Sequence, residues 1–107
     1  MSLHVTLTAI RPTEVYTANI THNLNSMAIA AKLYGCLWRP EEFGITKASE
    51  LIVPLTEGLA CLIKDKAYLQ TYNPLNGWGD YEYLVEFVTK YLAACVDNPD
   101  ADISVSR

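Results

Sequence analysis

Positive charge is scarce in this sequence of 107 residues. The chain has 8 lysines and arginines against 12 aspartates and glutamates, so its formal net charge is −4. The arginines are Arg11, Arg39 and Arg107. Domains that bind nucleic acid place a basic patch or stripe against the phosphates. The charge balance therefore predicts that nucleic acid is not a partner.

Long apolar runs and paired cysteines are also missing. No run approaches the roughly 18 apolar residues of a membrane-spanning helix, so we expect no membrane span. Residues 3–10 alternate between apolar and polar side chains and lack the basic start of a signal peptide. Cys36, Cys61 and Cys95 are an odd number and show no CxxC spacing, which is typical of reduced thiols. These features predict a cytoplasmic protein.

The sequence contains no recognisable catalytic or metal-binding motif. It has no GxSxG, P-loop, HExxH or GxGxxG pattern. His4, His22 and the scattered cysteines do not have the spacing of a metal site. We therefore expect no metal, no cofactor and no catalytic residue.

What the chain does have is the composition of one globular domain over 1–107, with 50% apolar and 19% charged residues. Alternating apolar residues predict strands, and apolar residues at helical spacing predict helices. The expected strands are 3–10, 14–20 and 101–106, and the expected helices are 22–37, 47–65 and 81–96. The order β-β-α-α-α-β predicts an α+β two-layer domain, in which three main helices cover a small three-stranded sheet. The last strand is expected to pair with one of the first two.

Single residues mark the ends of these elements. Arg11-Pro12 is expected to end the first strand. Asp80 is a good N-cap for the last helix, and Thr46 for the second. Pro54 removes a backbone hydrogen bond and predicts a kink in helix 47–65.

Two of the three thiols are expected in the core. Cys61 and Cys95 fall among apolar residues at helical spacing and are predicted to be buried and slow to react. Cys36 lies near the end of its predicted helix and is expected to react faster.

His22 and Asn23 open the first predicted helix. The positive end of the helix dipole favours a neutral histidine, which suits a base or a ligand contact. Polar side chains at such positions also act as caps and turn formers. The sequence leaves both roles open.

The segment Trp38-Arg39-Pro40 belongs to the most polar and aromatic cluster of the chain. The planar guanidinium of Arg39 can bind a carboxylate or phosphate through two parallel hydrogen bonds. It can equally form a structural ion pair with Glu41, Glu42 or Asp80.

Aromatic residues are dense around the glycine-rich turn before the last helix, where they comprise Tyr68, Tyr72, Trp78, Tyr81 and Tyr83. Rings with an apolar body and a polar tip are favoured at interfaces and in ligand pockets. The alternative is that they close the mouth of the core. Trp78 and Tyr81, at the helix start, are the strongest binding candidates of this group.

Several phrases of the sequence resemble a family of small uncharacterised proteins found in phage and bacterial genomes. The phrases that carry the resemblance are Tyr16–Leu24 with its His-Asn-Leu, Leu37–Glu42, Asn76–Gly79, Leu84–Val88 and Ile103–Arg107. The resemblance covers most of the chain from Tyr16 onward and implies a phage or bacterial origin. It carries over no catalytic residue.

Together these patterns predict a small non-enzymatic binding protein that engages a host protein or a small anionic or nucleotide-like ligand. The predicted ligand-binding residues are His22, Asn23, Trp38, Arg39, Trp78 and Tyr81. One alternative is a small enzyme that uses His22 and Arg39 on a phosphate or glycosyl ester. Another is a structural subunit of a homo-oligomer.

Overall fold

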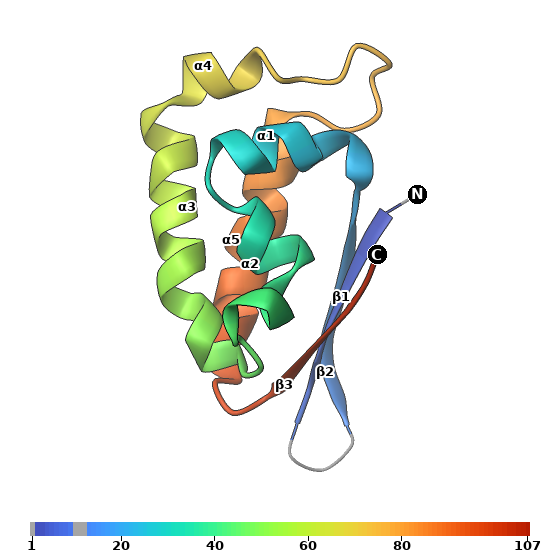
Figure 1. The fold of residues 1–107 in the computed structure, drawn as a ribbon, viewed down its shortest axis with the longest axis vertical. Helices are drawn as coiled ribbons and strands as arrows, with labels where there is room; N and C mark the ends of the chain where they lie inside the picture. Colours follow the sequence, from blue (N-terminus) through green and yellow to red (C-terminus); the bar gives the residue numbers. More distant parts are fainter. Residues whose placement is uncertain (1, 10–12) are drawn as a thin grey trace.

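The computed structural model describes residues 2–9 and 13–107 (Figure 1). Its sheet consists of three antiparallel strands, namely β1 (Ser2–Thr8), β2 (Glu14–Thr21) and β3 (Asp102–Ser106), in the order β2-β1-β3. The expected pairing of the last strand with one of the first two is confirmed, and its partner is β1. The break predicted at Arg11-Pro12 lies outside the described residues.

One face of the sheet carries the core. Leu3, Val5 and Leu7 of β1 and Ile20 of β2 are fully buried, as the alternation of apolar residues predicts. Residues of opposite parity point to the other face and are exposed, as His4 is, or half-buried, as Thr6 is. The helices all lie on the buried side of the sheet (Figure 1). The predicted α+β class with helices on one face is therefore confirmed.

The single helix predicted over 22–37 is wrong, because the chain breaks it into three pieces. These are a 3₁₀ turn η1 (His22–Leu24), helix α1 (Asn25–Ala30) and helix α2 (Tyr34–Trp38). Lys32, between the two helices, has a positive φ of 62°. Residues two apart point in nearly opposite directions on a helix, so one straight helix would direct Ala31 and Leu33 toward different neighbours. The break at Lys32 lets both be fully buried.

The middle of the chain forms short 3₁₀ turns before its first long helix. These elements are η2 (Pro40–Phe43), η3 (Ala48–Leu51), α3 (Ile52–Lys64) and α4 (Lys66–Gln70). The predicted cap at Thr46 is wrong: Lys47 is the N-cap, and the Glu50 carboxylate accepts from the backbone N–H of Thr46 at 3.0 Å and of Lys47 at 2.9 Å. Pro54 lies in the first turn of α3, where a helix has no partner for its N–H groups, so the reason for the predicted kink disappears.

The last helix, α5 (Tyr81–Asp97), begins as predicted. The Asp80 carboxylate accepts from the Tyr83 N–H at 2.8 Å, which confirms the N-cap. Leu84 and Val88 are fully buried. The helix packs against β2, where the rings of Tyr16 and Tyr91 stack with centroids 5.9 Å apart. No helix of the described residues is both long enough and apolar enough to cross a membrane.

The structure reverses part of the expectation for the thiols. Cys95 is fully buried as predicted, but Cys36 is only 8% exposed, and Cys61 is the partly exposed thiol. Cys61 lies on α3, whose apolar residues extend around much of the helix; Ile63 of that helix is 65% exposed. Helical spacing alone could not identify the buried side of this helix.

Burial raises the pKa of Cys36 to about 11 and that of Cys95 to about 12. We therefore expect a thiol reagent to label Cys61 in the native protein and to label the other two only on unfolding. Burial, and then its hydrogen bond to Asp65, also raise the pKa of Cys61, so its labelling should accelerate as the pH rises above 7. Mass spectrometry after timed labelling, with and without denaturant, measures this. Cys61→Ser is the control, and labelling of Cys36 as fast as Cys61 would contradict the burial.

Candidate functional site

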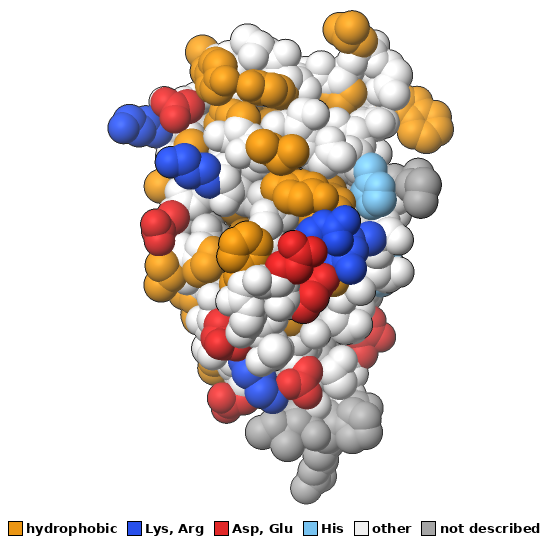
Figure 2. Space-filling view, viewed as in Figure 1, with side chains coloured by type: hydrophobic (Ala, Val, Ile, Leu, Met, Phe, Trp, Pro, Cys, Tyr) orange, Lys and Arg blue, Asp and Glu red, His pale blue; other side chains and the backbone are white. Residues whose placement is uncertain are grey.

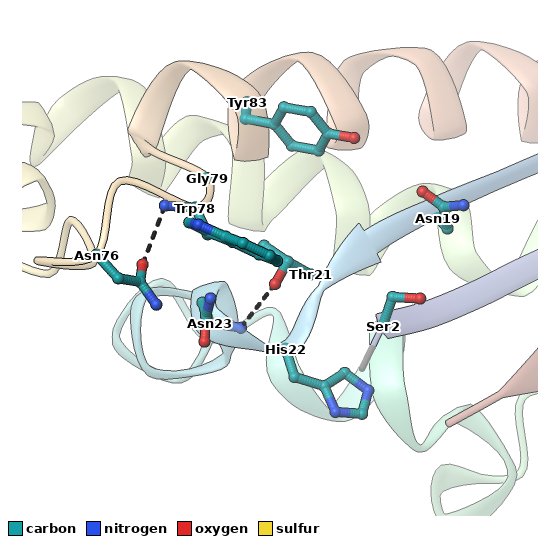
Figure 3. A pocket seen from close by; sticks show the side chains of 9 residues that line it. All are labelled: Ser2, Asn19, Thr21, His22, Asn23, Asn76, Trp78, Gly79 and Tyr83. Atoms are coloured by element: carbon teal, nitrogen blue, oxygen red, sulfur yellow. Dashed lines mark hydrogen bonds between the residues drawn. The ribbon is translucent and has the colours of Figure 1, made fainter.

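A hollow of about 820 Å³ opens where the end of β2 meets the loop before α5 (Figure 3). Four helices and strands and one loop contribute residues to it. The lining residues are Ser2 from β1, Asn19 and Thr21 from β2, His22 and Asn23 from η1, Asn76, Trp78 and Gly79 from the loop, and Tyr83 from α5. Each of these side chains is uncharged apart from the titratable imidazole.

The loop that carries Trp78 is held by its own side chains. The Asn76 Oδ1 accepts from the Trp78 N–H at 3.0 Å, and the dashed line in Figure 3 marks this bond. The Asn73 Oδ1 accepts from the Tyr81 N–H at 2.8 Å and fixes the end of the loop to the start of α5. Both glycines beside Trp78 have positive φ, 76° at Gly77 and 91° at Gly79. The sequence Asn-Gly-Trp-Gly therefore defines a specific turn.

Gly79 allows the loop that carries Trp78 to pack closely against the end of β2. A Cβ at this position would lie 2.8 Å from Cγ2 of Thr21 and 3.1 Å from Cδ1 of Leu24. Only glycine allows the loop to approach the end of β2 this closely. At Gly77, by contrast, a Cβ would meet nothing within 4 Å.

Because the two glycines differ in their surroundings, Gly77→Ala and Gly79→Ala form a matched pair of variants. Gly77→Ala meets only the backbone penalty of a positive φ, about 1–2 kcal/mol. Gly79→Ala meets a similar penalty and also clashes with Thr21, so we expect it to lower the free energy of unfolding more than Gly77→Ala does. Urea unfolding of both variants measures the difference. Equal losses would mean that the loop does not rest on β2.

The Trp78 ring is 72% exposed and lies across the hollow, between Tyr83 and Thr21 (Figure 3). Burying an indole is strongly favourable, so an exposed one on an ordered loop is available to a ligand. Tyr83, 47% exposed, presents a second ring from α5. The two aromatic side chains form one wall of the hollow.

Amide groups supply most of the polar contacts. Asn19, Asn23 and Asn76 each offer a donor and an acceptor group. The Thr21 hydroxyl accepts from the Asn23 N–H at 3.2 Å and keeps its own O–H to donate (Figure 3). The His22 Nε2 is shielded from solvent without a hydrogen-bond partner among the described residues.

The structure brings together three of the six residues predicted to bind a ligand, His22, Asn23 and Trp78. Tyr81 is only 4% exposed, and its hydroxyl donates to the Leu62 carbonyl at 2.6 Å, so it is a core residue. Trp38 is only 2% exposed and stacks on Tyr34 with centroids 5.4 Å apart. These two burials correct the expectation that Trp38 and Tyr81 face a ligand.

Arg39 lies outside the hollow and has a carboxylate partner. Its Nη1 is 3.2 Å from Oε2 of Glu42, one of the partners expected for a structural ion pair. Arg107 forms a second pair with Glu41 and donates to the Trp38 carbonyl at 2.8 Å. Acidic and basic side chains are accordingly mixed in the middle of the face in Figure 2.

The aromatic residues around the glycine-rich turn do not all belong to one site. Tyr68 and Tyr72 pair edge to face, with centroids 5.5 Å apart and their hydroxyls hydrogen-bonded at 2.8 Å. Trp78 and Tyr83 alone of this group line the hollow. Sequence reasoning ranked Tyr81 above Tyr83, although the cap at Asp80 places Tyr83 two positions further round the helix and toward solvent.

Asn19 and Asn76 were not predicted. The signal for Asn76 was present, because an asparagine before Gly-Trp-Gly commonly closes a turn with its side chain. Asn19 had no local signal, since its role follows from the position of β2 at the sheet edge.

Comparisons with protein-family models, with curated proteins and with solved structures found no match to this chain. Among the described residues, no group of three or more histidine, cysteine, aspartate or glutamate side chains is placed to hold a metal ion. The hollow itself is therefore the feature of this chain that bears on its function.

Proposed function

We propose that this chain is a non-enzymatic binding protein whose ligand enters the hollow between β2 and the Asn76–Gly79 loop. The observation that carries the proposal is the 72% exposure of Trp78 on a loop that hydrogen bonds hold at Asn76 and Asn73. An ordered loop loses little entropy when a ligand binds, so the exposed ring is prepared for contact.

The lining favours a ligand with a flat face and uncharged polar edges. The rings of Trp78 and Tyr83 can stack on a planar group, and the three asparagines can pair with its donors and acceptors. A nucleobase-like ring or the side chain of a host protein has this chemistry. The anionic ligand expected from the sequence has less support, because Arg39 lies outside the hollow and pairs with Glu42.

The enzymatic alternative also has less support. It requires His22 and Arg39 to act on one substrate, and only His22 lines the hollow. No carboxylate of the described residues lines the hollow to orient the imidazole. The origin in a phage or bacterial genome remains a prediction from the resemblance.

Tryptophan fluorescence tests the proposal directly, because Trp38 is buried and Trp78 is exposed. The probes are adenosine, guanosine, cytidine and uridine, and the N-acetyl amides of leucine, phenylalanine and tyrosine. We expect at least one probe to protect Trp78 from quenching by acrylamide. Trp78→Ala lacks the reporter ring, so its binding is measured by titration calorimetry beside the wild type. Since stacking contributes about 1–3 kcal/mol per base, this variant should bind about fivefold more weakly or worse.

Leu75→Ala is the matched control. Leu75 lies in the same loop, is fully exposed and does not line the hollow, so this variant should bind as the wild type does. If no probe changes the quenching, or if Trp78→Ala binds each probe unchanged, the proposed site is wrong.

A further inference from the structure

The two outer strands of the sheet, β2 and β3, differ in whether a neighbouring segment pairs with their outer edge. The edge of β3 is covered by a neighbouring segment: the Ile103 N–H donates to the Thr46 carbonyl at 3.0 Å, and the Ala48 N–H donates to the Ala101 carbonyl at 2.9 Å. Among the described residues, no backbone hydrogen bond joins β2 to any segment other than β1. The outer edge of β2 therefore presents unpaired backbone donors and acceptors.

β2 also lacks the features that usually protect a free edge. It has no proline and no lysine, and its one charged residue, Glu14, is the first of the strand. Its pairing with β1 is irregular only at that end, opposite Leu7 and Thr8, and is continuous from Tyr16 to Thr21. Such an edge is a template for pairing with another extended chain.

A trough lies beside the end of this edge, at Asn19 and Thr21, with α5 as its other wall. The hollow at Trp78 adjoins a smaller one of about 130 Å³, and Asn19 and Tyr83 line both. The smaller hollow is completed by three residues of α5, Glu86, Phe87 and Lys90. The two hollows together extend from the end of β2 toward the middle of α5.

We propose that an extended segment of a partner protein binds in this trough and pairs with β2 as a fourth strand of the sheet. The inference rests on the proposed function, because the hollow at Trp78 would receive one side chain of that segment. Backbone groups of the segment pair with the free groups of β2, and every second side chain points into the trough. Asn19, Tyr83 and Phe87 favour uncharged side chains there, apolar or aromatic, and the charges of Glu86 and Lys90 offset each other in an ion pair.

A second copy of this chain fits the trough less well. In an antiparallel pairing of two β2 strands along their length, the start of one strand lies opposite the end of the other. Glu14 of one copy would then face Thr21 and the hollow of the other, where no lysine or arginine lines the wall. A carboxylate placed there loses hydration without gaining a partner.

The test begins with a displayed library of random linear peptides selected on the wild-type protein. The strongest binder is synthesised, and its affinity is measured for two lysine variants on the same face of the sheet. Asn19→Lys lies on the free edge, whereas Ser104→Lys lies on the covered edge. We expect Asn19→Lys to weaken binding by about tenfold or more and Ser104→Lys to leave it unchanged, with both variants folded by circular dichroism.

Amide hydrogen exchange distinguishes strand addition from binding in the hollow alone. In an antiparallel edge strand, alternate N–H groups point outward. A bound peptide should therefore newly protect alternate residues of β2 and none of β3. If the peptide requires Trp78 but leaves exchange in β2 unchanged, this inference is overturned while the proposed function stands.

Two further results would also overturn the inference. One is a selection that yields no binding peptide. The other is free protein that is dimeric by light scattering and already shows alternate protection along β2, which would mean that a second copy occupies the edge. Failure of the proposed function has a different signature, in which Trp78→Ala changes binding of neither the small probes nor the peptide.

Discussion

Leu84→Ala is expected to lower the free energy of unfolding by about 2–5 kcal/mol, the usual cost of a cavity at a well-packed leucine. Leu84 is fully buried and lies one turn after the Asp80 cap that starts α5. The truncation therefore removes packing between the longest helix and the rest of the core, close to the loop that carries Trp78.

Lys90→Ala on the same helix is the control. The Lys90 side chain is 65% exposed and pairs with Glu86 one turn earlier, and an ion pair in water contributes little to stability. Urea or thermal unfolding of both variants provides the comparison. Similar midpoints would show that the buried face of α5 has been assigned wrongly.

Local sequence patterns predicted the elements that bury one face and expose the other. The alternation around Leu3, Val5 and Leu7 identified β1 because one face of that strand is buried and the other is exposed. The period of α5 was equally clear, and Asp80 supplied a cap with a known mechanism. In these elements the local preference and the tertiary contacts agree.

The prediction failed where two buried residues, close together in the sequence, lie on either side of a break in the helix. Residues 22–37 have helical spacing, yet the chain makes a left-handed turn at Lys32, and Ala31 and Leu33 on either side of it are both fully buried. Lysine has no particular preference for positive φ, so nothing local marks the break. After the turn Leu33 packs on Gly58, a contact that joins distant parts of the chain.

The candidate site was predictable to the extent that it depends on local chemistry. His22, Asn23 and Trp78 stood out as polar or aromatic residues at turns, and the structure groups them in one hollow. Whether Trp38 or Tyr81 faces solvent depends on packing against remote residues such as His22 and Leu62. Aromatic residues occur both in cores and in binding sites, so residue type alone could not separate these roles.

Gly58→Ala is expected to destabilise the protein, although the same change stabilises most helices. Replacing glycine with alanine inside an exposed helix usually contributes about 0.5–1 kcal/mol of stability. Gly58 is buried within α3, and a Cβ there would overlap Cγ and Cδ2 of Leu33, with Cδ1 only 3.1 Å away. Overpacking of this kind costs about 1–3 kcal/mol, so the net effect should be a loss.

A double-mutant cycle with Leu33→Ala tests the cause of that loss. Leu33 is fully buried, so Leu33→Ala alone should cost about 2–5 kcal/mol through the cavity it leaves. In the double variant the new methyl group enters that cavity, so the combined loss should be smaller than the sum of the two single losses by about 0.5–3 kcal/mol. Glu57→Ala, exposed on the same helix, controls for helix propensity. Strict additivity would mean that Leu33 does not pack on Gly58.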